Sequence, residues 1–327
     1  AFLPAVGAIR RVVLAELGPA GVAATAARLL DEAPEATTLD RELWTGLCVG
    51  GGPRRDEDVG PGFSAAVVQR LFTEKRLDEA LPLFAKDAPV FPVKHDVVGQ
   101  GGWVQLLAAV KGKYGKLHVV VNNAGIKTFA KASESSAQVW QQAIDVNFGA
   151  IYHSVNVILP HMKEHNEGGQ FITTASMSGL LPAVTAGIYT TTKFAAVAIM
   201  EALRIELEGT NIGTSAFCPG GVNTDNRPPG SRPPPAPGRF AFPPGASMDP
   251  LEAGERVLNG MRNNDLFILS HPEFRAGMAE RFNSILLSCP DEAFPAERLP
   301  FEARTRHTGI YPREVVHRMK KRDTYRA

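Results

Sequence analysis

From about residue 97 onward, the spacing of apolar residues alternates between two periods. Short apolar runs typical of buried strands lie at Leu117 to Val121, Gln170 to Thr174, Thr214 to Cys218 and Leu266 to Ser270. Between them lie longer amphipathic runs typical of helices, at Trp103 to Tyr114, Ala137 to His165 and Ile188 to Glu208. Strands that alternate with long helices are typical of βαβ units. The pattern therefore predicts an α/β fold, a Rossmann-like, doubly wound and mainly parallel sheet flanked by helices.

Three regions depart from this alternation. Residues 1–38 have apolar positions near helical spacing and are interpreted as a helical extension ahead of a dehydrogenase-like domain over 39–292. The stretch 226–250 contains nine prolines, so we expect a mobile loop that closes as a lid over a substrate. Residues 293–327 form a basic tail, which from Phe301 has eight Lys and Arg against three acids. A solvated extension is favoured there over a docking or anion-binding role.

Composition narrows the class of partner. The 35 basic and 34 acidic residues nearly cancel, which argues against nucleic acid or an anionic membrane as a partner. The three cysteines have no metal-like or redox-pair spacing, and the sequence contains no apolar run long enough to cross a membrane. We therefore expect a cytoplasmic protein with a small-molecule substrate and no bound metal.

The strongest candidate for chemistry is the pair Tyr189 and Lys193. Four residues apart on a helix, the two side chains share one face. A nearby ammonium group favours the phenolate and lowers the pKa of tyrosine, which suits it to general acid–base work. Taken alone the spacing is common, so the neighbouring segments carry the argument.

Small polar residues follow three of the predicted strands. Ser176 comes after Gln170 to Thr174, where its hydroxyl can bind a substrate oxygen or merely cap a turn. Asn122-Asn123-Ala124-Gly125 follows Val121, and its asparagine amides can tie strand ends together. Pro219-Gly220-Gly221-Val222-Asn223-Thr224 follows Cys218 and can present backbone N–H groups and a hydroxyl to a carboxamide or phosphate. Asn147, inside a long helical run, has the alternative reading of an ordinary surface amide.

In this order and spacing, the motifs resemble the classical short-chain dehydrogenase/reductase family over roughly residues 97–291. The resemblance implies Tyr189 as acid and base, with Ser176 holding the substrate oxygen. It further implies that Lys193 binds the nicotinamide ribose and assists Tyr189, and that Asn147 completes a water-linked proton relay. Asn123, Ala124, Gly125, Pro219, Gly220, Val222 and Thr224 become candidate cofactor contacts, and His271-Pro-Glu-Phe274 resembles the C-terminal part of some bacterial members.

The cofactor loop is a less complete match. Thr45-Gly46-Leu-Cys-Val-Gly50-Gly51-Gly52 fits the family's glycine pattern, which predicts that Gly46, Gly50 and Gly52 cradle the pyrophosphate. The flanking residues are charged or rich in Pro and Gly, which fits neither a buried strand nor a first helix. A remodelled region is the alternative.

Cofactor choice depends on the residue that ends the second strand of the fold. If that strand is Ala65 to Val68, Arg70 lies near the 2′ position of the ribose, which favours NADP over NAD. A solvent-facing arginine is the alternative. Asp96, ahead of Val97, resembles the acid that the family places near the adenine amine.

The predicted reaction is the NAD(P)-dependent interconversion of a secondary alcohol and a ketone by a homodimer or homotetramer. The pocket candidates are Met177, Leu180, Leu181, Val184, Phe240 and Phe242, which favour a largely apolar substrate if they do not serve packing alone. Two alternatives remain: a non-redox isomerase, cyclase or lyase on the same fold, and a non-catalytic binding protein with a degenerate cofactor loop.

Overall fold

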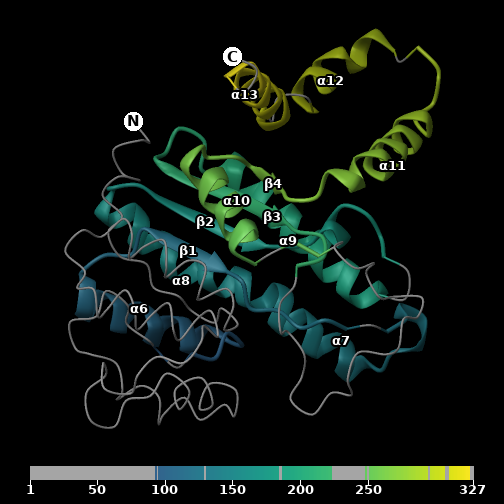
Figure 1. The fold of residues 1–327 in the computed structure, drawn as a ribbon. Helices are drawn as coiled ribbons and strands as arrows, with labels where there is room; N and C mark the ends of the chain where they lie inside the picture. The colour runs from purple at the N-terminus through teal and green to yellow at the C-terminus, as the bar shows by residue number, and fades with distance from the viewer. Residues whose placement is uncertain are drawn as a thin grey trace.

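The chain folds around a parallel sheet. The computed structural model describes residues 93, 95–128, 130–183, 186–222, 247–248, 250–293, 295–305 and 309–324. Within them, β1 (Val119–Asn122), β2 (Gly169–Thr174), β3 (Ile212–Cys218) and β4 (Phe267–Leu269) pair in chain order, every pair parallel (Figure 1). The predicted parallel sheet is confirmed, with β3 beginning earlier than expected and β4 shorter at both ends.

Long helices precede and connect these strands. Helix α6 (Gln100–Tyr114) comes before β1, whereas α8 (Ala150–His165), α9 (Gly187–Glu206) and α10 (Pro250–Arg262) each lie between two successive strands. The single helix predicted over 137–165 is instead α7 (Ala137–Ile144) and α8, joined by a π-helical turn, η4 (Asp145–Gly149). A π turn inserts an extra residue into the helical ladder and rotates the side chains around it, often at a functional site. Hydrophobic periodicity alone does not reveal this turn.

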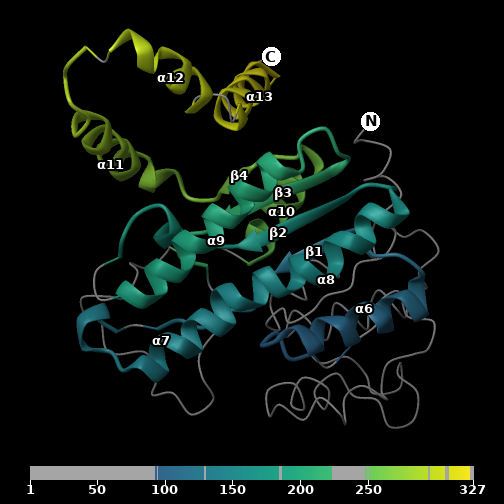
Figure 2. The same ribbon diagram turned by 180° about the vertical axis from the view of Figure 1, so that it is seen from behind.

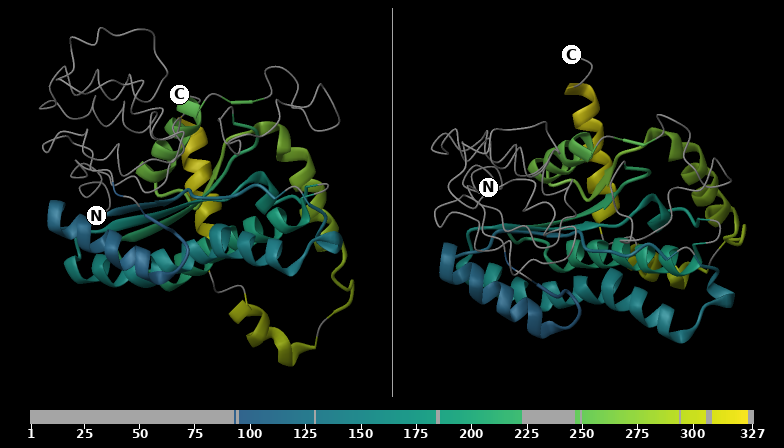
Figure 3. Two further views of the ribbon diagram at one scale, coloured as in Figure 1. Left: turned by 90° about the horizontal axis from the view of Figure 1, so that it is seen from below. Right: turned by 60° about the horizontal axis from the view of Figure 1, so that its bottom comes forward.

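The two faces of the sheet bury different residues, because successive side chains of a strand point to opposite sides. Val120, Phe171 and Ala216 belong to the large core under α6, α8 and α9. Val119 and Ile172 pack instead with Met261 of α10 on the other face. Figures 2 and 3 show these helices on the two sides of the sheet. Near-continuous apolar strands follow from this double coverage.

The C-terminal helices leave the sheet and then return to it. Figure 1 shows α11 (Arg275–Leu287) and α12 (Leu299–Thr305) standing away from the strands, whereas α13 (Ile310–Thr324) comes back toward them. On α13, Arg318 donates to the Phe267 carbonyl and Glu314 accepts from the Leu266 N–H. The described part of the tail thus departs from a wholly solvated extension, since α13 uses its side chains to cover the outer edge of β4.

Short 3₁₀ turns complete the described elements: η3 (Ala132–Glu134), η5 (Met177–Gly179), η6 (Pro272–Phe274) and η7 (Ala296–Arg298). Several sequence-based assignments lie outside the described residues: the extension 1–38, the loop with Gly46, Gly50 and Gly52, Arg70, Val184, Thr224 and most of 226–250, including Phe240 and Phe242. Among the helices that the structure describes, none is long and apolar enough to cross a membrane.

Candidate active site

The carboxyl ends of the parallel strands bring the predicted chemical groups to one edge of the sheet. Asn123 to Gly125 follow β1, Ser176 follows β2 and Pro219 follows β3. Helix α9, which contacts β2 and β3, carries Tyr189 and Lys193 in its first two turns. Parallel βαβ sheets bind their ligands at this edge.

Lys193 is the most unusual of these residues, because its charged side chain is 4% exposed. Its Nζ donates to the Thr174 carbonyl at 2.7 Å and lies 5.6 Å from the centroid of the Tyr189 ring. A Cβ added to Gly125 would lie 3.5 Å from this nitrogen and 3.4 Å from Asn147 Oδ1. Tyr189, Asn147 and the segment after β1 therefore all lie near the Lys193 ammonium group.

Burial lowers the pKa of Lys193 to about 8, since the apolar surroundings disfavour the charged form. The neighbouring Cys218 acts in the opposite direction, and Lys127 lowers the pKa further. The described residues supply no carboxylate to balance the charge of Lys193. A buried ammonium with only a carbonyl partner is costly for stability, so its position calls for a functional reason.

The pKa of Tyr189 differs from the sequence-based expectation. Burial raises it, and a hydrogen bond with Ser176 opposes that rise. We expected Lys193 to lower this pKa, but desolvation of the phenol is the larger effect. Tyr189 is therefore held as a neutral phenol, the form that can donate a proton. Ser176 Oγ also accepts a bond from the Ser178 N–H at 3.1 Å, so its position is fixed by the turn it caps.

Asn147 lies on the π-helical turn and is 1% exposed, which excludes the reading as a surface amide. Its Oδ1 accepts from the Ile126 N–H at 2.8 Å, and its Nδ2 donates to the Ile126 carbonyl and to Thr192 Oγ1, both at 3.0 Å. Asn147 therefore joins the segment after β1 to α9. Both of its amide hydrogens have protein partners, and its part in a proton relay stays a prediction.

The prediction that asparagine amides tie the strand ends together is confirmed. Thr174 Oγ1 donates to Asn123 Oδ1 at 2.9 Å, which joins the ends of β1 and β2. Asn122 Nδ2 reaches Thr173 Oγ1 at 3.4 Å. The next residues, Ala124 and Gly125, have small or absent side chains and are partly exposed, which leaves the backbone open to close approach by a ligand.

The turn after β3 lies beside the serine. The Pro219 carbonyl accepts from the Met177 N–H at 2.8 Å, next to Ser176. Further along, Val222 bridges to Met248, whose N–H donates to the Gly221 carbonyl at 2.8 Å. Pro219, Gly220 and Val222 are partly exposed and lie at the carboxyl edge of the sheet, and their contact with a cofactor stays a prediction.

Asp96 and Val97 occupy the segment before α6. Asp96 is exposed and its carboxylate accepts from the Val98 N–H at 2.9 Å. Val97 is 5% exposed, and its carbonyl accepts from Trp103 Nε1 at 3.1 Å. Both residues help to fix the start of α6, and their contact with an adenine stays a prediction.

An apolar group lies close to Ser176. Met177 is buried and Leu180 packs against the same core, while Leu181 approaches Gly277 of α11. Phe274 and Met278, which were not among the predicted pocket residues, also pack on this core from the segment after β4. No role was assigned to His271 from the sequence, although a histidine directly after a predicted strand satisfies the argument that identified Ser176 and Pro219.

A cluster of metal-type ligands lies at the opposite edge of the sheet, where the strands begin. His118, His165 and Glu167 present ligand atoms within 4.8 Å of one another. However, His165 Nε2 lies 3.1 Å from the Leu117 carbonyl and its Nδ1 accepts from the Glu167 N–H at 3.2 Å. Because both ring nitrogens of His165 already have partners, this cluster is explained by hydrogen bonding within the protein.

A family model for short chain dehydrogenases matches residues 61–232, which is more than half of the chain. The chain belongs to the short-chain dehydrogenase family. Its relatives include an uncharacterized oxidoreductase of Staphylococcus epidermidis, 32% identical over 163 residues that cover 50% of this chain and 69% of the relative. A 3-alpha-(or 20-beta)-hydroxysteroid dehydrogenase of Mycobacterium bovis is 31% identical over 39% of this chain and 49% of that enzyme. The chain is an oxidoreductase of this family, as the names of these relatives support.

Solved structures agree with this assignment. A putative short-chain dehydrogenase from Novosphingobium aromaticivorans matches with a TM-score of 0.60 and 29% identity, covering 73% of this chain and 85% of that one. A family member from Burkholderia phymatum in complex with NAD matches with a TM-score of 0.56 and 27% identity, over 70% and 94% of the two chains. The Rossmann-like fold predicted from the sequence is thus confirmed.

Proposed function

We propose that the chain interconverts a secondary alcohol and a ketone with NAD(P), using Ser176, Tyr189 and Lys193, supported by Asn147. The observation that carries the proposal is the buried Lys193 ammonium beside the Tyr189 ring, with a backbone carbonyl and no described carboxylate as its partner. Membership of the family supports hydride transfer as the reaction. The buried Lys193 ammonium supports a site at the carboxyl edge of the sheet.

The residues at the carboxyl edge fit the nicotinamide end of a dinucleotide. Lys193 offers a cation to ribose hydroxyls, Gly125 leaves space above it, and the turn from Pro219 to Val222 offers backbone groups for a carboxamide. When bound, the nicotinamide supplies the hydride acceptor or donor. Gly46, Gly50 and Gly52 remain the candidates for the pyrophosphate.

Tyr189 moves the proton in this proposal. As a neutral phenol, it donates its proton to a ketone oxygen during reduction and becomes the phenolate, and as the phenolate it takes the proton of the substrate hydroxyl during oxidation. Ser176, which is hydrogen-bonded to Tyr189, holds the same oxygen so that the transfer distance is short. Lys193 stabilises the phenolate that forms when the proton leaves, because its ammonium lies near the ring in a site of low dielectric constant.

Asn147 supports these groups through contacts with two segments. Its bonds to Ile126 and Thr192 set the distance between the residues after β1 and the helix that carries Tyr189. A proton relay through Asn147 would use the remaining lone pair of Oδ1, since its amide hydrogens are already engaged.

The proposed substrate is largely apolar. Met177, Leu180 and Leu181 lie next to Ser176, and Phe274 and Met278 pack on the same core. Relatives named as hydroxysteroid dehydrogenases, among them one of Eggerthella lenta that is 31% identical, favour bulky alicyclic alcohols as first candidates. NADP remains the favoured cofactor because Arg70 follows the predicted strand Ala65 to Val68 in the sequence. The Burkholderia phymatum relative, by contrast, is in complex with NAD.

Titration of NADH and NADPH against the purified chain, followed by nicotinamide fluorescence, tests the cofactor. Incubation with a panel of apolar ketones and secondary alcohols, hydroxysteroids included, then tests the reaction by absorbance at the nicotinamide band and by product analysis. The proposal predicts that ketone is lost in step with reduced nucleotide. Product formation without a change in nicotinamide absorbance would support an isomerase, cyclase or lyase instead. A folded protein that binds neither nucleotide would support the binding-protein alternative.

A further inference from the structure

The side chain of His271 is buried against the turn that follows β3. His271 comes two residues after the end of β4 and is 6% exposed. Its Nδ1 accepts from the Gly220 N–H at 3.0 Å, and its Nε2 lies 2.9 Å from the Gly221 carbonyl. One imidazole ring therefore contacts two consecutive peptide groups of the same turn.

These contacts define the tautomer of the ring. The Gly220 amide is always a donor, so Nδ1 must offer its lone pair, and Nε2 then carries the hydrogen that the Gly221 carbonyl accepts. Ser270 Oγ lies 2.7 Å from Nδ1 and shares that lone pair as a donor. A neutral imidazole with hydrogen on Nε2 satisfies every contact.

The fit between ring and turn leaves no room for a side chain at Gly220. A Cβ there would lie 2.7 Å from His271 Cγ and 2.8 Å from Phe274 Cε2. The aromatic ring of Phe274 stands edge-on to His271, with 6.2 Å between centroids. Glycine is required at this position because the turn packs directly on two rings.

The turn held by His271 lies at the carboxyl edge of the sheet, beside the proposed catalytic residues. Its first residue, Pro219, accepts from the Met177 N–H at 2.8 Å, immediately after Ser176. Cys218, the residue before the turn, is close enough to Lys193 to influence its pKa. A nicotinamide that exchanges hydride with a substrate held by Ser176 and Tyr189 must lie on this side, whereas the adenosine end lies farther away.

We infer that His271 is a positioning residue that fixes the turn Pro219 to Gly221 and thereby sets the nicotinamide end of the cofactor site. The structural part of this inference is independent of the reaction, and the effect on the cofactor rests on the proposed function. The experiment therefore measures the turn and the cofactor separately.

Three substitutions test the two contacts of the His271 ring separately. His271→Asn retains an acceptor near the position of Nδ1, His271→Gln retains a donor near the position of Nε2, and His271→Phe keeps the ring while losing both. Hydrogen exchange of the ligand-free proteins reports on the turn through the Gly220 amide, whose bond to Nδ1 is the contact under test. We expect fast exchange at Gly220 in the Phe and Gln variants and protection close to wild type in the Asn variant.

Dissociation constants for the preferred reduced dinucleotide and for ADP-ribose then separate the two ends of the cofactor. Loss of the contacts should weaken dinucleotide binding by about tenfold, as expected for one or two buried hydrogen bonds, and leave ADP-ribose binding within about twofold. His118→Phe, the same change at the opposite edge of the sheet, is the control and should alter neither constant. Melting curves verify that each variant is folded.

Unchanged Gly220 exchange in folded His271→Phe would overturn the inference, as would equal weakening of dinucleotide and ADP-ribose. If wild type binds no dinucleotide, the proposed function fails and with it the link to the cofactor. The exchange rate of Gly220 would in that case still decide whether His271 holds the turn.

Discussion

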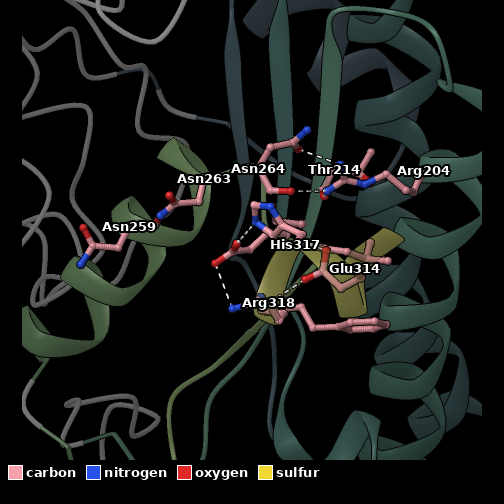
Figure 4. A network of polar contacts seen from close by, with 12 residues as sticks. Arg204, Thr214, Asn259, Asn263, Asn264, Glu314, His317 and Arg318 are labelled. Carbon is pink, nitrogen blue, oxygen red and sulfur yellow. Dashed lines mark hydrogen bonds and ion pairs between the residues drawn. The ribbon is translucent and has the colours of Figure 1, made fainter. Parts of the chain in front are cut away.

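The two edges of the parallel sheet both carry polar clusters, and they differ in how charge is balanced. At the edge where the strands begin, Asp265 is 5% exposed but pairs with His317 at 2.8 Å and Arg318 at 3.1 Å. Arg204 at the same edge donates to Asn264 Oδ1 at 2.8 Å and also bonds the Thr214 carbonyl (Figure 4). At the edge where the strands end, Lys193 is equally buried and has no described carboxylate.

This difference separates structural clusters from functional ones. Paired charges at the starting edge hold α13 against β4, where Glu314 and Arg318 satisfy the backbone groups of Leu266 and Phe267. An unbalanced buried charge lowers stability, so it persists only where another requirement maintains it. Substitution of Lys193 should therefore lower activity without lowering stability. Substitution of a buried paired charge at the starting edge should lower stability without lowering activity.

The largest effect is expected from Tyr189→Phe. Removing the phenolic hydroxyl takes away the proton donor while the ring still packs, so turnover should fall by at least about two orders of magnitude. Dinucleotide affinity and the melting temperature should stay close to wild type. Steady-state kinetics with a substrate found in the panel would measure this, and near-normal turnover would remove Tyr189 from the mechanism.

Lys193→Met should lower both turnover and cofactor affinity, by at least about tenfold each, because one ammonium serves the ribose and the phenolate. At the same time the melting temperature at pH 7 should stay the same or rise, since methionine fills the space without a buried charge. A loss of stability similar to that at the starting edge would contradict the distinction between the two clusters.

The stability difference between wild type and Lys193→Met should depend on pH in a defined direction. Its folded-state pKa of about 8 lies below the ordinary value of 10.5, so the unfolded chain binds the proton more tightly. The destabilisation is therefore complete below pH 8 and disappears as the pH rises toward 10.5. Melting curves of wild type and Lys193→Met should converge over that interval, and parallel curves would show that Lys193 is not destabilising.

Asp265→Asn should give the reverse result. The substitution removes the buried carboxylate that His317 and Arg318 share, and because Arg318 keeps its pair with Glu314 and both side chains are partly exposed we expect a loss of about 1 to 2 kcal/mol. Turnover per folded molecule and dinucleotide affinity should be unchanged. Denaturant unfolding measures the loss, and a tenfold drop in cofactor affinity would show that this edge also serves the site.

The smallest effect is expected from Glu167→Gln. Glu167 pairs with Lys116 and with His118 at 3.0 Å, which lowers the pKa of its carboxyl group to about 2. The carboxyl group is exposed to solvent, so these ion pairs are screened and contribute little. Melting temperatures should match wild type within error at physiological salt. A shift of several degrees would show that this cluster stabilises the protein more than its exposure suggests.

The sequence predicted the sheet and the grouping of polar residues at its carboxyl edge because both depend on local patterns. Apolar runs between amphipathic helices are sufficient for a parallel sheet, and polar residues directly after strands must meet at one edge. Ser176 and the Asn123 tie to Thr174 follow from that rule, and Lys193 follows from its helical spacing to Tyr189. His271 follows from the same rule, but its role depends on the register of β4 with β3, which spacing does not define.

Other features depend on three-dimensional packing and were not predictable in this way. The π-helical turn that carries Asn147 is only five residues long, too short to interrupt the hydrophobic pattern of the flanking helices, so the sequence indicated one continuous element. The return of α13 to β4 depends on Glu314 and Arg318, which by sequence alone are charges in a basic tail. The pKa of Tyr189 was expected to fall because its cation is visible in the sequence, whereas its burial is not.

The most direct test compares dinucleotide dissociation constants of wild type, Lys193→Met and Asp265→Asn, each with a melting curve. We predict that wild type binds NADH or NADPH, that Lys193→Met binds it at least about tenfold more weakly without a loss of stability, and that Asp265→Asn binds it normally while melting earlier. Equal affinities in wild type and Lys193→Met, or a folded wild type that binds neither nucleotide, would contradict it.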